Sequence, residues 1–151
     1  MSPRSVGPGP LWRREMPGEP ILIVDDNPVN LKLVRVLLAG EGYDARTAGD
    51  AEEALEILRE FHPKLILMDI QLPGMDGLDL TRCLKADPAT RGVVILALTA
   101  YAMKGDDKKM LAAGCDGYVS KPVDTRTLPQ LIADYLAGNR KSTPKTREGT
   151  G

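Results

Sequence analysis

One stretch of the chain reads Leu65-Ile-Leu-Met-Asp69, four apolar residues followed directly by a carboxylate. The same arrangement occurs earlier, where Ile21-Leu-Ile-Val24 is followed by Asp25 and Asp26. Apolar runs of this length, separated by stretches with helical periodicity, are typical of strands buried in a parallel sheet. Both runs therefore predict a buried strand that carries acidic side chains at its carboxyl end.

Two further apolar runs also end in polar side chains. Val93-Val-Ile-Leu-Ala-Leu98 is followed by Thr99, and Gly117-Tyr-Val-Ser120 is followed by Lys121. In an open α/β sheet, the ligand site lies beyond the carboxyl ends of the strands. We therefore expect three carboxylates, one hydroxyl and one ammonium to gather in one cleft, although they lie far apart in the sequence.

The segments between these runs have the features of helices. Asn27 is a favourable N-cap before Pro28, and Asp50 with Glu53 three residues later is typical of a capping box. The remaining elements are expected in this order: a helix from Pro28 to about Gly40, a strand at about Tyr43–Ala48, and helices from Asp50 to about His62, at about Leu78–Ala86 and near Asp106–Ala113. The last helix is expected to carry one apolar face formed by Leu128, Leu131, Ile132, Tyr135 and Leu136. Five strands alternating with five helices predict an α/β fold, in which a parallel sheet carries helices on both faces.

The chain length of 151 residues fits one domain. We assign residues 19–138 to this domain, and we interpret residues 1–18, which are rich in proline and glycine, as a flexible N-terminal tail. The polar residues 139–151 are predicted to form a disordered C-terminal tail. Met16 closely precedes the first strand, which leads to the hypothesis that translation begins at Met16 and not at Met1.

Charge is distributed unevenly along the chain. Residues 19–138 contain 13 Lys or Arg and 19 Asp or Glu, a formal charge of −6, whereas the N- and C-terminal tails carry +2 and +3. An acidic domain argues against nucleic acid as a partner. The apolar runs are too short to cross a bilayer, and the N-terminus has no hydrophobic signal region. We therefore expect a cytoplasmic protein with no membrane contact.

The cysteines and the histidine do not indicate a separate site. Cys83 and Cys115 lack the spacing of metal ligands, and in the cytosol they are expected to be reduced thiols. His62, the only histidine, stands beside Pro63 at a predicted helix end and is expected at the surface. A catalytic mechanism that depends on histidine is therefore not expected.

The expected cluster has the chemistry of a site for phosphoryl transfer. Two unit charges about 4 Å apart repel by roughly 4 kcal/mol at an effective dielectric constant near 20, so crowded carboxylates take up a proton or a cation. Mg²⁺ fits best, because it prefers oxygen ligands and needs few of them from the protein. With Lys121 and Thr99 on the other side, Asp69 is expected to be the nucleophile that forms an aspartyl phosphate.

Each of these residues also has a purely structural interpretation. An aspartate at a strand end is commonly a turn residue or a helix cap, and Asp25 and Asp26 before Asn27 could serve capping alone. Thr99 could be an ordinary β-branched strand residue, and Lys121 a solvated surface lysine. The joint pattern favours the functional interpretation, because all of these positions follow consecutive buried strands.

Four stretches of the chain match a known family: Ile23-Val-Asp-Asp-Asn-Pro-Val-Asn30, Leu67-Met-Asp-Ile-Gln-Leu-Pro-Gly-Met-Asp-Gly77, Ala97-Leu-Thr-Ala100 and Gly114-Cys-Asp-Gly-Tyr-Val-Ser-Lys-Pro122. Through these stretches, about residues 19–138 resemble the receiver domain of two-component response regulators. The segment from Thr99 through Val123 is especially similar to single-domain regulators of the DivK type and to receivers of hybrid histidine kinases.

The resemblance implies a flavodoxin-like (CheY-like) fold, with five parallel strands in the order 2-1-3-4-5. It implies that Asp69 accepts a phosphoryl group from a phosphohistidine on a partner and that Lys121 pairs with the phosphate. Mg²⁺ would be held by Asp25 or Asp26, by Asp69 and by the backbone carbonyl of Gln71. The family pattern favours Asp26 as the direct ligand, with Asp25 in support through water.

Thr99 and Tyr118 match the switch pair of the family. When Asp69 is phosphorylated, Thr99 would move toward the phosphate and Tyr118 would turn inward. This change would reshape the surface formed by the helix near 106–113, the strand at 117–120 and the last helix. That surface is where the resemblance places a downstream protein target.

Two further expectations follow from the resemblance. Gln71 and Tyr101 occupy positions that influence the rate of dephosphorylation in the family. The peptide bond between Lys121 and Pro122 is expected to be cis, an isomer that is rare enough to be a checkable feature.

The resemblance implies a phosphoacceptor signalling protein and not an enzyme that acts on other substrates. Its partners would be a sensor histidine kinase or a histidine phosphotransfer protein and a downstream protein target. It would be a monomer or a phosphorylation-induced dimer. Only about a dozen polar residues follow the last helix, which predicts a stand-alone regulator that signals through protein contacts and does not bind nucleic acid directly.

Other classes fit the sequence less well. A phosphohydrolase of the haloacid-dehalogenase type also uses an aspartyl nucleophile, but it needs a general acid two residues later, where this chain has Gln71. A dinucleotide-binding module needs a glycine-rich phosphate loop after the first strand, where this chain has Asp25-Asp-Asn-Pro28. A purely structural pseudo-receiver would be expected to lack part of the set of acids, Thr99 and Lys121.

Overall fold

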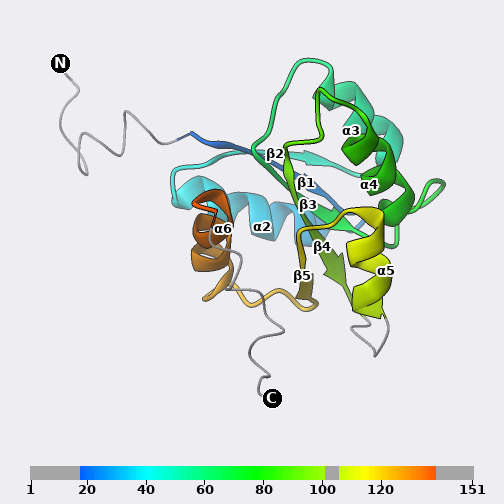
Figure 1. Ribbon diagram of the computed structural model, residues 1–151. Coiled ribbons are helices and arrows are strands. Elements are labelled where there is room, and N and C mark those ends of the chain that lie inside the picture. The colour runs from blue at the N-terminus through cyan, green and yellow to red at the C-terminus, as the bar shows by residue number, and fades with distance from the viewer. Residues whose placement is uncertain (1–17, 101–105, 139–151) are drawn as a thin grey trace.

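The computed structural model describes residues 18–100 and 106–138 of the chain. Within these residues, strands and helices alternate as the sequence predicts (Figure 1). The elements are β1 (Pro20–Val24), α2 (Pro28–Gly40), β2 (Asp44–Ala48), α3 (Ala51–Leu58), β3 (Leu65–Asp69), α4 (Gly77–Ala86), β4 (Val94–Thr99), α5 (Asp106–Ala113), β5 (Gly117–Ser120) and α6 (Leu128–Leu136). Met16, Tyr101 and most of the two predicted tails (residues 1–17 and 139–151) lie outside the described residues.

The five strands form one parallel sheet in the order β2-β1-β3-β4-β5, which confirms the predicted topology. All five residues of the central strand β3 are buried. Figure 1 shows α3, α4 and α5 over one face of the sheet and α2 and α6 over the other. The apolar runs therefore sit between two helical layers, as expected for strands of this composition.

Each layer has its own apolar core. On one face, Ala54 of α3, Leu80 of α4 and Met110 of α5 pack against the sheet. On the opposite face, Leu38 of α2 and Ile132 of α6 do the same. Because every strand is followed by a helix that runs back over the sheet, all strands end at the same side of the molecule, which we call the carboxyl end of the sheet.

The helix starts follow the predicted capping residues closely. The Asn27 side chain accepts hydrogen bonds from the amides of Val29 (2.9 Å) and Asn30 (3.3 Å). Asp50 accepts from the Glu53 amide at 2.8 Å. In a capping box the Glu53 carboxylate would accept from the amide of the cap residue Asp50. Here it accepts instead from the amide of Gly49, at 2.8 Å.

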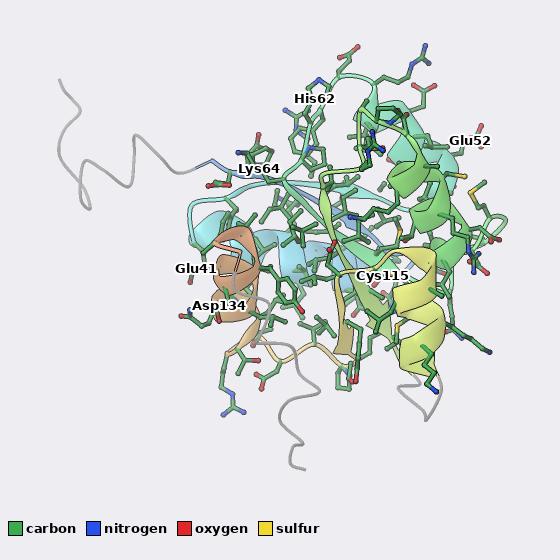
Figure 2. The ribbon with its side chains drawn as sticks, viewed as in Figure 1. Glu41, Glu52, His62, Lys64, Cys115 and Asp134 are labelled. Atoms are coloured by element: carbon green, nitrogen blue, oxygen red, sulfur yellow. The ribbon has the colours of Figure 1, made fainter. Side chains whose placement is uncertain are left out.

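One predicted boundary is wrong, because α3 ends at Leu58 and not near His62. After Leu58 the backbone forms hydrogen bonds between residues three positions apart, which are typical of a 3₁₀ turn. The Arg59 amide donates to the carbonyl of Glu56, and the Glu60 amide donates to the carbonyl of Ile57. His62 lies on the exposed connection between α3 and β3, as expected, and Figure 2 shows it at the outside of the molecule.

Cys83 is exposed and Cys115 is buried, and neither forms a disulfide. Burial raises the pKa of the Cys115 thiol to about 11, so the thiol is protonated at neutral pH. None of the helices in residues 18–100 and 106–138 has the length and apolarity needed to span a membrane.

Candidate functional site

Three carboxylates meet at the carboxyl end of the sheet. Asp25 follows the last residue of β1, Asp26 comes next, and Asp69 is the last residue of β3. The register pairs Val24 with Met68, so the two strands end side by side. Carboxylate oxygens of the three residues lie within 4.8 Å of one another. Asp25 and Asp69 are almost fully buried, at 1% and 2% exposure, whereas Asp26 is exposed.

Lys121, which follows the edge strand β5, also contacts this cluster. Its Nζ lies 3.0 Å from Oδ2 of Asp69 and 3.5 Å from Oδ2 of Asp25. Its backbone amide donates to the carbonyl of Thr99 at 2.8 Å, and its peptide bond to Pro122 is cis, as expected. One ammonium therefore contacts two buried carboxylates that belong to different strands.

Backbone amides orient both buried carboxylates. Oδ1 of Asp69 accepts a hydrogen bond from the Gln71 amide at 3.0 Å, and Oδ1 of Asp25 accepts from the Asn27 amide at 2.9 Å. In each case the donor lies two residues after the aspartate, which is the geometry of an Asx turn. The side-chain amide of Asn30 also approaches Oδ2 of Asp25, at 3.5 Å. Backbone amides therefore bind one oxygen of each buried carboxylate, and Lys121 contacts the other oxygen.

Burial and charge shift the ionisation of this cluster. Burial raises the pKa of Asp69, and the charge of Asp25 adds to this effect, while the Gln71 amide and Lys121 oppose it. Burial lowers the pKa of Lys121, but the carboxylates of Asp69 and Asp25 outweigh burial and the pKa rises overall. Lys121 therefore stays protonated, and the cluster still contains more carboxylates than cations.

This arrangement fits a divalent metal ion with a preference for oxygen. Mg²⁺ binds oxygen ligands at about 2.0–2.1 Å, so two ligands of one ion lie at most about 4.2 Å apart. The spacing of the oxygens of Asp25, Asp26 and Asp69 requires only small side-chain adjustments to reach this geometry. A bound cation would also relieve the repulsion that raises the pKa of Asp69.

The structure places the remaining predicted residues near this end of the sheet. Thr99 is the last residue of β4, is 1% exposed and stands beside the strand that ends in Asp69. Tyr118 is half-buried on β5 and packs against the core that includes Met68. Gln71 is exposed, and its backbone amide donates to Asp69. Binding of Mg²⁺ by its backbone carbonyl stays a prediction.

Two asparagines contribute to the site beyond what the sequence predicts, which is a helix cap for Asn27 and no role for Asn30. In the structure both also contact Asp25. The i, i+2 spacing of Asp25 and Asn27 is the signal that could have revealed the first contact, because an aspartate commonly accepts from the amide two residues later.

The chain matches a known protein family over most of its length. The model of the response regulator receiver domain family matches residues 21–133. A curated relative, the polar-differentiation response regulator DivK of Brucella ovis, is 44% identical over 116 residues, which cover 77% of this chain and 94% of the relative.

Solved structures show the same likeness. The receiver domain of a sensor histidine kinase of Pseudomonas aeruginosa, which has a magnesium ion coordinated in its active-site cleft, is 35% identical with a TM-score of 0.73 and covers 80% of this chain and 98% of its own. A CheY-like receiver domain protein of Methanospirillum hungatei is 35% identical with a TM-score of 0.73, over 82% and 98% of the two chains. The chain therefore belongs to the family of response regulator receiver domains.

Proposed function

We propose that this protein is a phosphoacceptor regulator in which Asp69 receives a phosphoryl group from a phosphohistidine. The donor would be a sensor histidine kinase or a histidine phosphotransfer protein. The observation that carries the proposal is the contact of Lys121 with two buried carboxylates of a three-carboxylate cluster. Such a cluster has the groups that phosphoryl transfer needs, a nucleophile and nearby positive charge.

In the proposed reaction, a carboxylate oxygen of Asp69 forms a bond to phosphorus while the bond between phosphorus and the imidazole nitrogen breaks. The nitrogen keeps the electron pair of the broken bond. Lys121 is placed to stabilise negative charge on the phosphoryl oxygens, since its Nζ already lies 3.0 Å from Asp69. Mg²⁺, held by Asp26 with Asp25, Asp69 and the carbonyl of Gln71, would neutralise further charge on the same oxygens.

In this proposal the protein catalyses only its own phosphorylation and dephosphorylation, and it is a signalling protein and not an enzyme with other substrates. Thr99 and Tyr118 would respond to the phosphate and alter the surface of α5, β5 and α6, where a target protein or a second copy of the chain would bind. The half-buried position of Tyr118 supports the proposal, because the side chain packs against the core and is also partly exposed at this surface.

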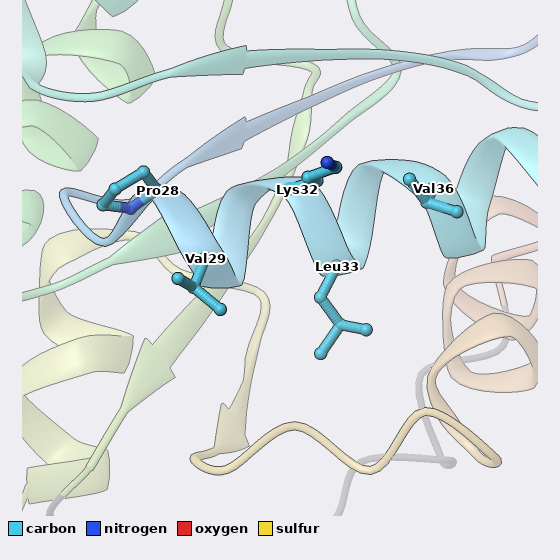
Figure 3. Close-up of a pocket in the computed structure, with 5 residues that line it drawn as sticks. All are labelled: Pro28, Val29, Lys32, Leu33 and Val36. Atoms are coloured by element: carbon cyan, nitrogen blue, oxygen red, sulfur yellow. The ribbon is translucent and has the colours of Figure 1, made fainter.

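The phosphodonor protein must cover surfaces next to the cluster, because a histidine side chain is short. One suitable surface is the outward face of α2, which begins two residues after Asp26 and is shown in Figure 3. Val29, Leu33 and Val36 are 73%, 48% and 53% exposed there and line a shallow pocket with Lys32. Exposed apolar side chains along one helix face favour contact with another protein.

The test uses acetyl phosphate, a small phosphodonor, with Mg²⁺ and the intact chain. Mass spectrometry is expected to detect one phosphoryl adduct on the wild-type protein, no adduct on Asp69→Asn and much less adduct when EDTA removes the metal. Absence of the adduct from the wild-type protein, or the same adduct on Asp69→Asn, would refute the assignment of Asp69. Asp44→Asn, at an exposed aspartate of β2, is the matched control and should be phosphorylated normally.

A further inference from the structure

Gly77, the first residue of α4, packs directly against the backbone of β3 at the candidate site. A Cβ atom built at Gly77 would overlap the carbonyl oxygen of Asp69, and it would lie 2.7 Å from Cα of Ile70 and 2.9 Å from the carbonyl carbon of Asp69. These neighbours are backbone atoms and not the flexible ends of side chains. A side chain at this position would therefore force the backbone of β3 or of α4 to move.

Gly77 also closes the loop that follows Asp69. Its amide donates to the carbonyl of Ile70 at 3.0 Å, so residues 70–76 form a loop whose two ends touch. Inside this loop the Gln71 amide donates to Oδ1 of Asp69 at 3.0 Å. The close approach of Gly77 and the orientation of the Asp69 carboxylate are thus parts of the same short loop.

The helix behind Gly77 is firmly anchored. The Asp76 side chain caps α4 by accepting from the Asp79 amide at 2.9 Å, and Leu80 and Leu84 are buried against the sheet. Asp69 and Ile70 lie where β3 ends, and the Ile70 amide donates to the carbonyl of Leu98 at 3.2 Å. An overlap at Gly77 would therefore displace either Asp69 and Ile70 or the start of α4, and either movement changes the loop that orients the Asp69 carboxylate.

From these contacts we infer that Gly77 is a positioning residue for Asp69. The missing side chain lets α4 contact the β3 backbone directly, and this contact holds the Asp69 carboxylate within reach of Asp25 and Lys121. The effect on metal binding rests on the carboxylate cluster alone. The effect on phosphorylation rests on the proposed function.

The expected consequence of Gly77→Ala is weak metal binding. Mg²⁺ demands near-octahedral geometry at short distances, and a displacement of about 1 Å at a reacting group can cost on the order of 100-fold in rate. We expect the dissociation constant for Mg²⁺ to rise about tenfold or more, and the rate of phosphorylation by acetyl phosphate to fall about 10- to 100-fold.

The experiment compares four full-length proteins: wild type, Gly77→Ala, Leu84→Ala and Gly40→Ala. Leu84→Ala opens a cavity under the same helix far from Asp69, so it controls for lost stability. Gly40→Ala adds a methyl group where no atom lies within 4 Å, so it controls for the chemical change. Mg²⁺ affinity is measured by calorimetric titration and thermal stability by circular dichroism.

The inference holds if only Gly77→Ala loses Mg²⁺ affinity, while Leu84→Ala loses stability but binds Mg²⁺ normally. Unchanged affinity of Gly77→Ala, or an equal loss in Leu84→Ala, would overturn it.

If Gly77→Ala does not fold, the amide resonance of Gly77 in the wild-type protein decides: Mg²⁺ should shift it, and an unmoved resonance overturns the inference. Lack of wild-type phosphorylation refutes only the proposed function, whereas lack of Mg²⁺ binding refutes both.

Discussion

Two pairs of lysine and aspartate lie at opposite ends of the same sheet. Lys121 and Asp69 stand 3.0 Å apart at the carboxyl end, with side chains 20% and 3% exposed. Lys85 and Asp116 stand 3.1 Å apart at the amino end, where β4 and β5 begin, with side chains 21% and 14% exposed. Distance does not distinguish the two pairs, and their lysines are equally buried.

The surroundings of the two pairs differ in charge. Lys85 also donates to the carbonyls of Val93 (2.7 Å) and Arg91 (3.3 Å), and Asp116 accepts from the Ile95 amide at 2.9 Å. One cation and one anion there balance each other and tie α4 to β4 and β5. At the other end, Lys121 must balance two buried carboxylates, with Asp26 close by.

This comparison teaches that charge balance, more than distance, separates a structural ion pair from a reactive one. A buried pair with satisfied hydrogen bonds fixes the chain locally. A cluster with surplus negative charge has affinity left for a divalent cation, and that cation can in turn bind phosphoryl oxygens.

The largest expected difference concerns phosphorylation of the two aspartate variants. Asp69→Asn should abolish phosphorylation by acetyl phosphate, whereas Asp116→Asn should retain the wild-type rate within about twofold, because Asp116 lies at the opposite end of the sheet. Intact mass measured over time gives both rates, with circular dichroism to verify folding. Similar losses of phosphorylation rate in both folded variants would contradict the distinction between the two ion pairs.

The second-largest expected difference concerns the stability of Lys85→Met and Lys121→Met. Lys85→Met should lower the free energy of unfolding by about 2–3 kcal/mol, since it removes the ammonium that pairs with the Asp116 carboxylate and donates to two backbone carbonyls. Lys121→Met in millimolar Mg²⁺ should cost less, because the carboxylates can still bind a divalent cation. Urea denaturation measures both values, and a larger loss for Lys121→Met would reverse our interpretation.

Mg²⁺ should stabilise the wild-type protein through the carboxylate cluster. At ten times its dissociation constant, a ligand that binds only the folded state adds about 1.4 kcal/mol. Asp26→Asn should lose most of this gain, while Asp44→Asn should keep it, because Asp44 lies at the start of β2. Thermal unfolding with and without Mg²⁺ provides the comparison, and the prediction fails if both variants respond alike.

The smallest expected effect is the pH dependence of stability without metal. Because the pKa of Asp69 is raised above 3.8, the contribution of Asp69 to the free energy of unfolding falls as the pH rises from below this value through the raised pKa. Asp69→Asn lacks this loss, so it should be more stable than the wild-type protein at neutral pH, and the advantage should vanish below pH 3.8.

Asp116→Asn should show the opposite sign at neutral pH, since it removes the partner of Lys85. Urea denaturation at several pH values in EDTA measures both effects. A destabilised Asp69→Asn at neutral pH would show that the cluster is balanced in the absence of metal, contrary to the comparison.

Much of this arrangement was predictable from local patterns. The apolar runs before Asp25, Asp69, Thr99 and Lys121 predicted parallel strands, and parallel strands joined by helices must all end on one side. Capping by Asn27 and Asp50 was also predictable, because a cap contacts residues only a few positions further along the chain. These features need no knowledge of contacts between distant segments.

Other features required the folded chain, because they depend on which distant segments touch. The pairing of Lys85 with Asp116 joins residues 31 positions apart, and no pattern in either segment indicates the other. Gly77 was predictable as part of a turn, but its approach to Asp69 depends on how α4 packs on the sheet. Local propensity and periodicity specified the order of the elements and the ends of the strands, whereas packing specified which charges are balanced and which are left in surplus.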